Sequence, residues 1–183
     1  MGIVFLKPSD TGFDYTGVQP EDVVILPAFG VTIHDFETLR AKGCVMVDTT
    51  CGSVLNVWKR VETYARDGYT SLIHGKYYHE ETRATASQVE KYPGGAYLVV
   101  RDMAQAEDVI AHIEGRFPGG RDAFLDKYRH AASPAFDPDV HLRRVGVANQ
   151  TTMLARESLA IGEAVGQAMA RAHGEAHRAE HFR

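Results

Sequence analysis

Cysteine is scarce in this chain of 183 residues, which contains only Cys44 and Cys51. Two thiols exclude a disulfide-rich scaffold, and a single cysteine cannot hold zinc or an iron–sulfur cluster without further ligands. If residues 44–50 form a strand, a rise of roughly 3.3 Å per residue separates the two thiols by about 23 Å. A disulfide needs Cα atoms within about 7 Å, so we expect two free thiols, as in a reducing compartment.

Long apolar runs and a strong net charge are also absent. No run approaches the ~20 residues of a membrane span, and the N-terminus lacks the basic and apolar regions of a secretory signal. The net charge of -4 provides no general attraction to nucleic acid or to a membrane. With 44% hydrophobic and 24% charged residues the composition is ordinary for a globular protein. We expect a cytoplasmic chain with neither nucleic acid nor membrane as a partner.

Short apolar runs alternate with helical patterns along the chain. This alternation predicts an α/β fold whose sheets are mostly parallel and flanked by helices. The expected strands cover residues 3–6, 23–26, 44–47, 70–73, 96–100 and 145–148.

The expected helices follow from capping residues and from apolar residues at helical spacing. The first runs from Thr32 to Gly43. The others cover residues 54–65, a stretch that ends at about residue 90, and residues 103–113, 121–132 and 155–173. The last should face inward through Leu159, Val165, Ala168, Met169 and Ala172. The polar tail, 174–183, should be frayed.

Cys51 follows the strand expected at 44–47 and precedes a helix. The partial positive charge and unpaired N–H groups of a helix N-terminus favour thiolate over thiol, which suits a reactive or metal-binding sulfur. Equally, Cys51 can be a half-buried thiol at a strand end, and spacing alone does not decide between the two. Cys44, inside the apolar run, is most simply a small core residue.

Two further polar sets follow predicted strands. His74, His79, Glu80 and Glu81 form one, and a histidine beside a carboxylate is a usable acid–base and anion-binding pair. Residues 149–152 (Asn-Gln-Thr-Thr) form the other, with amides and hydroxyls that can bind phosphate or simply satisfy a loop. The carboxyl ends of parallel strands lie at one edge of a sheet, where ligands bind. No Walker loop, GxGxxG or HExxH motif is present.

Several longer motifs occur together in one order. They are VVILPAFG (23–30), VDTTC (47–51), VW (57–58), GYTSLIHGKYYHEETRATAS (68–87), FDPD (136–139) and VGVANQTTML (145–154). In this order they closely resemble the 4-hydroxy-3-methylbut-2-enyl diphosphate reductase family (IspH/LytB), in its chloroplast-type branch. The resemblance covers nearly the whole chain from about residue 20.

The resemblance implies a reaction and a set of residue roles. The family reduces hydroxymethylbutenyl diphosphate to isopentenyl and dimethylallyl diphosphates with a 4Fe-4S cluster held by three cysteines, one from each of three α/β lobes. By this resemblance Cys51 is a cluster ligand, and His79 helps hold the diphosphate. Glu81 is the catalytic acid that delivers protons to the leaving hydroxyl. Thr151 lies near that hydroxyl, with Gln150 beside it in the substrate site.

The resemblance also implies an architecture and shows departures from it. Three-layer lobes should form a trefoil-like three-lobe architecture, with 1–50 as the end of the first lobe and 51–183 as the second. Gly52 stands where the family usually has proline, and Phe29 stands where many members have histidine. The other two cluster cysteines should lie before Met1 and after Arg183. We therefore expect this chain to be inactive alone.

Two other functions remain as alternatives. One is a non-catalytic α/β diphosphate-binding module or subunit without a cluster, and the other is a flavodoxin-like electron carrier, by fold analogy alone. Reading the gene on either side of this segment separates the enzyme from the module. A ferredoxin or flavodoxin-type electron donor is the expected partner of the enzyme. An isolated central segment should also expose apolar surface and self-associate.

Overall fold

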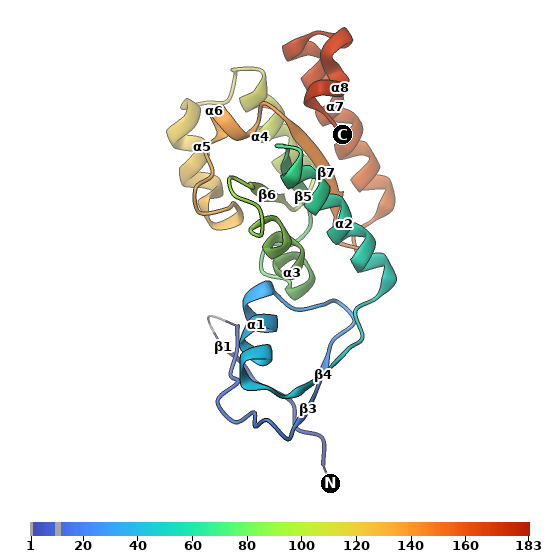
Figure 1. Ribbon diagram of the computed structural model, residues 1–183. Coiled ribbons are helices and arrows are strands. Elements are labelled where there is room, and N and C mark those ends of the chain that lie inside the picture. The colour runs from blue at the N-terminus through green and yellow to red at the C-terminus, as the bar shows by residue number, and fades with distance from the viewer. Residues whose placement is uncertain (1, 10–11) are drawn as a thin grey trace.

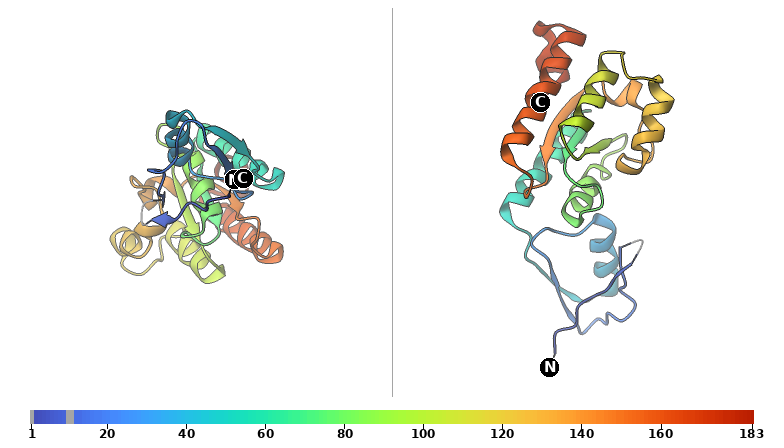
Figure 2. Two further views of the ribbon diagram at one scale, coloured as in Figure 1. Left: turned by 90° about the horizontal axis from the view of Figure 1, so that it is seen from below. Right: turned by 180° about the vertical axis from the view of Figure 1, so that it is seen from behind.

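The computed structural model describes residues 2–9 and 12–183. A small N-terminal unit lies at one end of an elongated molecule, and a larger α/β unit forms the rest (Figures 1 and 2). The chain passes from the smaller to the larger unit just before Cys51, the residue that precedes the second helix.

The secondary structure alternates largely as the sequence predicts. The strands are β1 (Pro8–Ser9), β2 (Gly12–Phe13), β3 (Val23–Leu26), β4 (Val45–Asp48), β5 (Thr70–His74), β6 (Tyr97–Val100) and β7 (Val145–Asn149). The helices are α1 (Ile33–Lys42), α2 (Gly52–Arg66), α3 (Glu80–Val89), α4 (Met103–Ile113), α5 (Gly120–Tyr128), α6 (Pro138–His141), α7 (Ala155–His173) and α8 (Arg178–His181), with 3-10 turns η1 (Arg129–Ala131) and η2 (Glu175–His177). Within the described residues, none of these helices has the length and apolarity to cross a membrane.

The larger unit is built on a parallel sheet with strand order β6-β5-β7. The register pairs Leu72 of β5 with Leu98 on one side and with Val147 on the other. Leu72 belongs to the core that includes α4 and α7, whereas Ile73 packs with residues of α3. Because side chains alternate between the two faces of a strand, helices cover both faces and give three layers.

The fit between α2 and the sheet depends on a glycine. A Cβ on Gly146 of β7 would lie 2.6 Å from the ring of Tyr64 on α2. The Tyr64 hydroxyl then donates a hydrogen bond to the carbonyl of Val147, 3.1 Å away. The absent side chain therefore lets α2 pack close to β7.

The crossover from β6 to β7 contains α4, α5, η1 and α6. Since α4 starts at the carboxyl end of β6 and runs back across the sheet, the α4–α5 loop lies at the edge where the strands begin, as Figure 1 shows at the top of the molecule. Phe124 of α5 is completely buried against this layer, whereas Pro118 to Gly120 are exposed.

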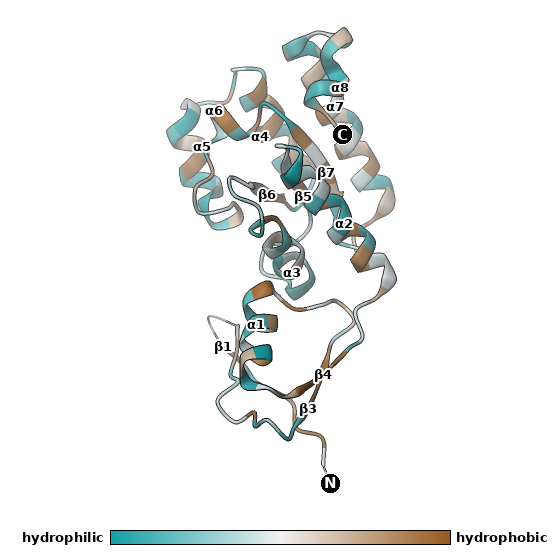
Figure 3. Cartoon of the chain, viewed as in Figure 1, coloured by the Kyte–Doolittle hydropathy of each residue, from teal (hydrophilic) through white to brown (hydrophobic). Residues whose placement is uncertain are grey.

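The N-terminal unit consists of the parallel pair β3 and β4 with α1 packed on one face. Thr32 caps α1 by accepting a hydrogen bond from the Asp35 N–H at 3.1 Å, and Gly43 ends the helix at a φ of 76°, as the sequence predicts. The opposite face of the pair carries exposed aliphatic side chains, and Figure 3 colours β3 and β4 mainly as hydrophobic. Its members are Val23, Ile25, Val45 and Val47.

The two units are joined by short backbone and side-chain contacts. The Cys51 N–H donates to the carbonyl of Ala28 at 2.8 Å, and the Ile33 N–H donates to Oγ of Ser87 at 3.1 Å. Gly30 has a φ of 80°, and a Cβ there would lie 2.3 Å from the Trp58 ring. The ring of Trp58 on α2 thus rests directly on the backbone of the N-terminal unit.

Two sequence expectations, a strand at 3–6 and an inward-facing Leu159 and Ala172, are wrong. Residues 3–6 form no strand, and Ile3, Val4 and Phe5 are more than 80% exposed. Leu159 is 75% exposed and Ala172 is also exposed, because the buried stripe of α7 is centred on Ile161, Val165, Ala168 and Met169.

The tail is not frayed. It forms η2 and α8, after which the Arg183 N–H donates to the Val145 carbonyl at 3.0 Å and the Val147 N–H to the Arg183 carbonyl at 2.9 Å. The guanidinium of Arg183 lies 4.4 Å from the centre of the Tyr69 ring. These contacts add the chain end to the outer edge of β7, which polar composition alone did not reveal.

Candidate active site at the strand ends

The carboxyl ends of β5 and β7 bring together two of the predicted polar sets. His74 is paired in register with Asn149, so the loops that leave both strands start side by side. The first loop leads into α3 and carries His79 and Glu81, and the second leads into α7 and carries Gln150 and Thr151. The predicted clustering at one sheet edge is therefore present for these two sets.

Glu81 joins the two loops directly. Its side chain is buried, with 3% exposed, in the first turn of α3. Its Oε1 accepts a hydrogen bond from the Thr151 N–H at 2.5 Å, across 70 residues of sequence. This contact holds the Thr151 backbone against the carboxyl group that the resemblance makes the catalytic acid.

Gln150 has a positioning role in the loop. Its buried Oε1 accepts hydrogen bonds from the Lys76 N–H and the Thr82 hydroxyl, each at 3.1 Å, and its Nε2 donates to Oγ1 of Thr152 at 2.6 Å. A Cβ on Gly75 would lie 2.8 Å from Oγ1 of Thr82, so only glycine permits this packing. Thr82 and Gly75 are site residues that spacing alone did not single out.

His79 caps α3. Its Nδ1 accepts a hydrogen bond from the Glu81 N–H at 3.1 Å, which requires an unprotonated Nδ1 and leaves the proton of the neutral ring on Nε2. The Phe29 ring meets the imidazole edge-on, with centroids 6.3 Å apart. His79 thus presents an N–H donor at the N-terminus of a helix, an arrangement that favours an anion.

Cys51 lies at the N-cap of α2 with its side chain exposed, while Cys44 is buried as predicted, and both thiols are free. The sulfur makes no regular capping hydrogen bond, yet the adjacent N–H and hydroxyl of Ser53 lower the pKa of the thiol. Burial and the negative charge of Glu81 oppose that lowering. An exposed thiol with a lowered pKa is suited to binding a soft metal.

The metal-ligating residues of the described ranges do not make a complete metal site. No group of three or more His, Cys, Asp or Glu side chains there is arranged to hold a metal ion. One thiolate fits a single ligand position of an iron–sulfur cluster, and an intact cluster needs further ligands. These residues alone therefore do not fit the whole cofactor that the resemblance implies.

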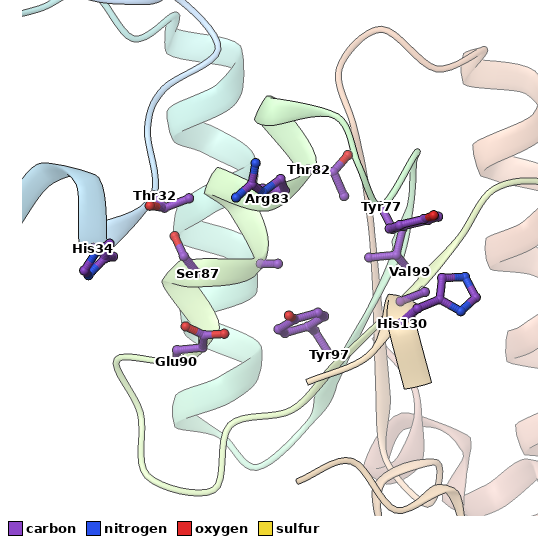
Figure 4. Close-up of a pocket in the computed structure, with 12 residues that line it drawn as sticks. Thr32, His34, Tyr77, Thr82, Arg83, Ser87, Glu90, Tyr97, Val99 and His130 are labelled. Carbon is purple, nitrogen blue, oxygen red and sulfur yellow. The ribbon is translucent and has the colours of Figure 1, made fainter. Parts of the chain in front are cut away.

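A cavity of about 330 Å³ lies on another side of α3 and holds none of the predicted site residues (Figure 4). Arg83 and Ser87 of α3 line it together with Glu90, the residue after that helix, and with Tyr97 of β6 and His130 of η1. Arg83 is paired to Glu80 at 3.3 Å. The predicted chemistry is located at the strand ends and not in this cavity.

A buried acid and a capping imidazole lie at the carboxyl ends of parallel strands, and an exposed thiol precedes α2, in an α/β protein of the kind that binds ligands at its strand ends. The family model described as "LytB protein" matches residues 1–179. The chain belongs to this family.

Named relatives agree with the family match. A 4-hydroxy-3-methylbut-2-enyl diphosphate reductase of Synechococcus sp. (strain RCC307) is 48% identical over 162 residues, covering 88% of this chain and 38% of that protein. The reductase of Synechococcus sp. (strain WH7803) is 44% identical over 182 residues, which cover all of this chain and 44% of that protein. The chain spans less than half the length of these curated relatives.

Two solved structures share the fold. One is the structure titled (E)-4-hydroxy-3-methyl-but-2-enyl diphosphate reductase, the terminal enzyme of the non-mevalonate pathway, with a TM-score of 0.61 and 21% identity over 85% of this chain and 44% of that one. The other is the E-1-hydroxy-2-methyl-but-2-enyl-4-diphosphate reductase from Plasmodium falciparum, with a TM-score of 0.56 and 18% identity over 92% of this chain and 40% of that one. These matches confirm the predicted α/β fold class as part of a trefoil-like architecture.

Proposed function

We propose that this chain forms the central part of a 4-hydroxy-3-methylbut-2-enyl diphosphate reductase of the non-mevalonate isoprenoid route. The reaction removes the substrate hydroxyl as water, consumes two electrons and two protons, and forms isopentenyl or dimethylallyl diphosphate. The observation that carries the proposal is the hydrogen bond from the Thr151 N–H to Oε1 of Glu81. It joins the two motifs that the resemblance assigns to the substrate hydroxyl.

Glu81 has the position that a proton donor needs. An acid must lie within hydrogen-bond reach of the leaving oxygen, and Glu81 is buried beside the backbone of Thr151. The hydroxyl of Thr151 can hydrogen-bond the substrate oxygen, because Thr151 contacts Glu81 through its backbone N–H. We assign proton delivery to Glu81 and orientation of the substrate hydroxyl to Thr151, with Gln150 holding the loop.

His79 is our candidate for the diphosphate. Its Nε2–H is free to donate because Nδ1 is occupied by the Glu81 N–H. The N-terminus of α3 adds partial positive charge close by. An imidazole and a helix N-terminus together can bind a phosphate oxygen without a lysine cluster.

Cys51 would provide one ligand of a 4Fe-4S cluster, which supplies the electrons when bound. The remaining ligands would come from other parts of a longer protein, with residues 1–50 as the end of a first lobe and 51–183 as a second. Two features support this division. A short segment before Cys51 connects the two units, and α1 packs in a hydrophobic core of its own. A ferredoxin or flavodoxin-type protein would be the electron donor, in the cytoplasm.

A segment exchange tests the function. The matched 162-residue segment of the Synechococcus sp. (strain RCC307) relative is replaced by the corresponding residues of this chain, giving a hybrid that we call the exchange protein. We expect the exchange protein to reduce 4-hydroxy-3-methylbut-2-enyl diphosphate, and the 183-residue chain alone to show no turnover. A folded exchange protein that binds its cluster but lacks activity would contradict the proposed function. Turnover by the 183-residue chain alone would contradict the proposal that this chain is only part of the enzyme.

A diphosphate-binding module without a cluster is the second candidate. The observation in its favour is that Cys51 is the only cysteine among the predicted site residues. Iron and sulfide analysis after anaerobic reconstitution, combined with calorimetry using inorganic diphosphate, distinguishes the two. Diphosphate binding by the chain with an inactive but cluster-containing exchange protein would favour the module.

We also propose that the isolated chain self-associates through the uncovered face of β3 and β4. Four aliphatic side chains there have no covering layer, and Val45 is 58% exposed. Val45→Thr replaces one methyl by a hydroxyl while keeping the size and the β-branch, so it should weaken association in analytical ultracentrifugation by several-fold. Val140→Thr is the matched control, because Val140 is 59% exposed on α6, outside this face. A monomer at all concentrations, or equal effects of both variants, would argue against this surface.

A further inference from the structure

His74 is a completely buried imidazole that the proposed roles leave unused. It is the last residue of β5, and its side chain has 0% exposure. Nδ1 lies 2.8 Å from Oγ of Ser158 in the first turns of α7. Nε2 is buried and has no hydrogen-bond partner within residues 2–9 and 12–183, and the nearest carboxyl oxygen, on Glu157, is 3.9 Å away.

Ser158 links the His74 ring to the start of α7. Its Oγ lies 2.8 Å from Nδ1 of His74 and 3.3 Å from the Leu154 carbonyl, and its backbone N–H donates to the same carbonyl at 3.0 Å. A chain of hydrogen bonds therefore connects the His74 ring through Ser158 to Leu154. Burial lowers the pKa of His74, and the charge of Glu157 opposes this lowering.

The backbone of His74 holds the other end of the same loop. Its carbonyl accepts a hydrogen bond from the Gln150 N–H at 2.8 Å. The loop that carries Thr151 runs from Gln150 to Leu154, which is the N-cap of α7. Gln150 is hydrogen-bonded to the His74 carbonyl, and Leu154 is connected through Ser158 to the His74 ring. One residue thus fixes both ends of a five-residue loop.

We propose that His74 is a positioning residue that sets the distance between Thr151 and Glu81. The catalytic relevance of this role rests on the proposed function, but the geometry does not. A loop held at both ends from the last residue of a central strand cannot shift without breaking one of the two bonds. The short contact from the Thr151 N–H to Glu81 is the element of the site that this arrangement would maintain.

Amide hydrogen exchange in the 183-residue chain tests the inference without any assay of turnover. His74→Leu removes the ring nitrogen that bonds to Ser158, and Ser158→Ala removes the hydroxyl that bonds to His74. We expect both to lower the protection of the Thr151 amide at least tenfold relative to the Leu72 amide of β5, and to shift the Thr151 amide proton upfield. His74→Asn places an amide near the position of Nδ1 and should restore most of the protection.

Ser71→Ala is the matched control. Ser71 is on the same strand, is also completely buried, and has no hydrogen-bond partner for its hydroxyl among the described residues. This variant should change Thr151 protection less than twofold. If His74→Leu fails to fold, Ser158→Ala still decides the question, because Ser158 is only partly buried. Unchanged Thr151 protection, or an equal loss at Leu72 and Thr151, would overturn the proposal. Since the readout is an amide and not a rate, its failure is distinguishable from failure of the proposed function.

Discussion

Replacing Glu81 with glutamine in the exchange protein is expected to lower kcat by about 10²–10⁴-fold, the usual contribution of a positioned proton donor. Gln keeps a carbonyl oxygen that can accept the Thr151 N–H, so the loop contact is retained. It cannot deliver a proton to the leaving oxygen. Because substrate binding does not need that proton, KM should change far less than kcat.

Glu80→Gln is the control for this experiment. Glu80 is the adjacent residue in the first turn of α3, and it pairs on the surface with Arg83 at 3.3 Å. Surface pairs of this kind contribute little, so kcat and stability should change less than twofold. Comparable losses from the two substitutions would assign the effect to the charge of the α3 terminus. A Glu81→Gln variant within threefold of the parent would remove Glu81 from its proposed role.

Gly30→Ala is expected to destabilise the chain by about 2–4 kcal/mol, from the cost of a left-handed conformation together with overpacking against Trp58. The added Cβ would lie 2.3 Å from the ring, which must move. Trp58 is the only tryptophan of the chain, so its fluorescence reports the junction directly. We expect a shift of the native emission maximum and a lower urea midpoint.

Gly43→Ala separates the two causes. Gly43 also has a positive φ, of 76°, but no heavy atom lies within 4 Å of the added Cβ. It should cost about 1 kcal/mol through conformational strain and leave the Trp58 emission unchanged. An unaltered emission spectrum in Gly30→Ala would show that the junction does not depend on this close approach.

The regular elements could be predicted because local signals and tertiary packing agree. Thr32 caps the helix that was expected to start there, and Gly43 ends it. The apolar pattern also identified β3, β5 and β7 to within a residue or two. The pattern could not specify which face of a helix or strand is covered by the neighbouring layer. Leu159 satisfies helical spacing but faces solvent, because packing on α4 selects a stripe centred on Val165.

The site was predictable as a set of residues but not as a set of contacts. The motifs placed His79, Glu81 and Thr151 at strand ends, and the structure brings Glu81 and Thr151 into direct contact. The strand order that makes β5 and β7 neighbours depends on long-range packing, which spacing does not encode. For the same reason, the hydrogen bond between His74 and Ser158, 84 residues apart, had no sequence signal.

The α4–α5 loop has a consequence for how this protein can change in length. Residues inserted between Pro118 and Gly120 would extend into water at the edge where the strands begin, since this turn is exposed. They would alter neither the strand register nor the two loops that carry Glu81 and Thr151. An insertion of equal size between His74 and His79 would separate the imidazole that caps α3 from its strand. Natural variants and grafted tags should therefore be tolerated at the first position and rejected at the second.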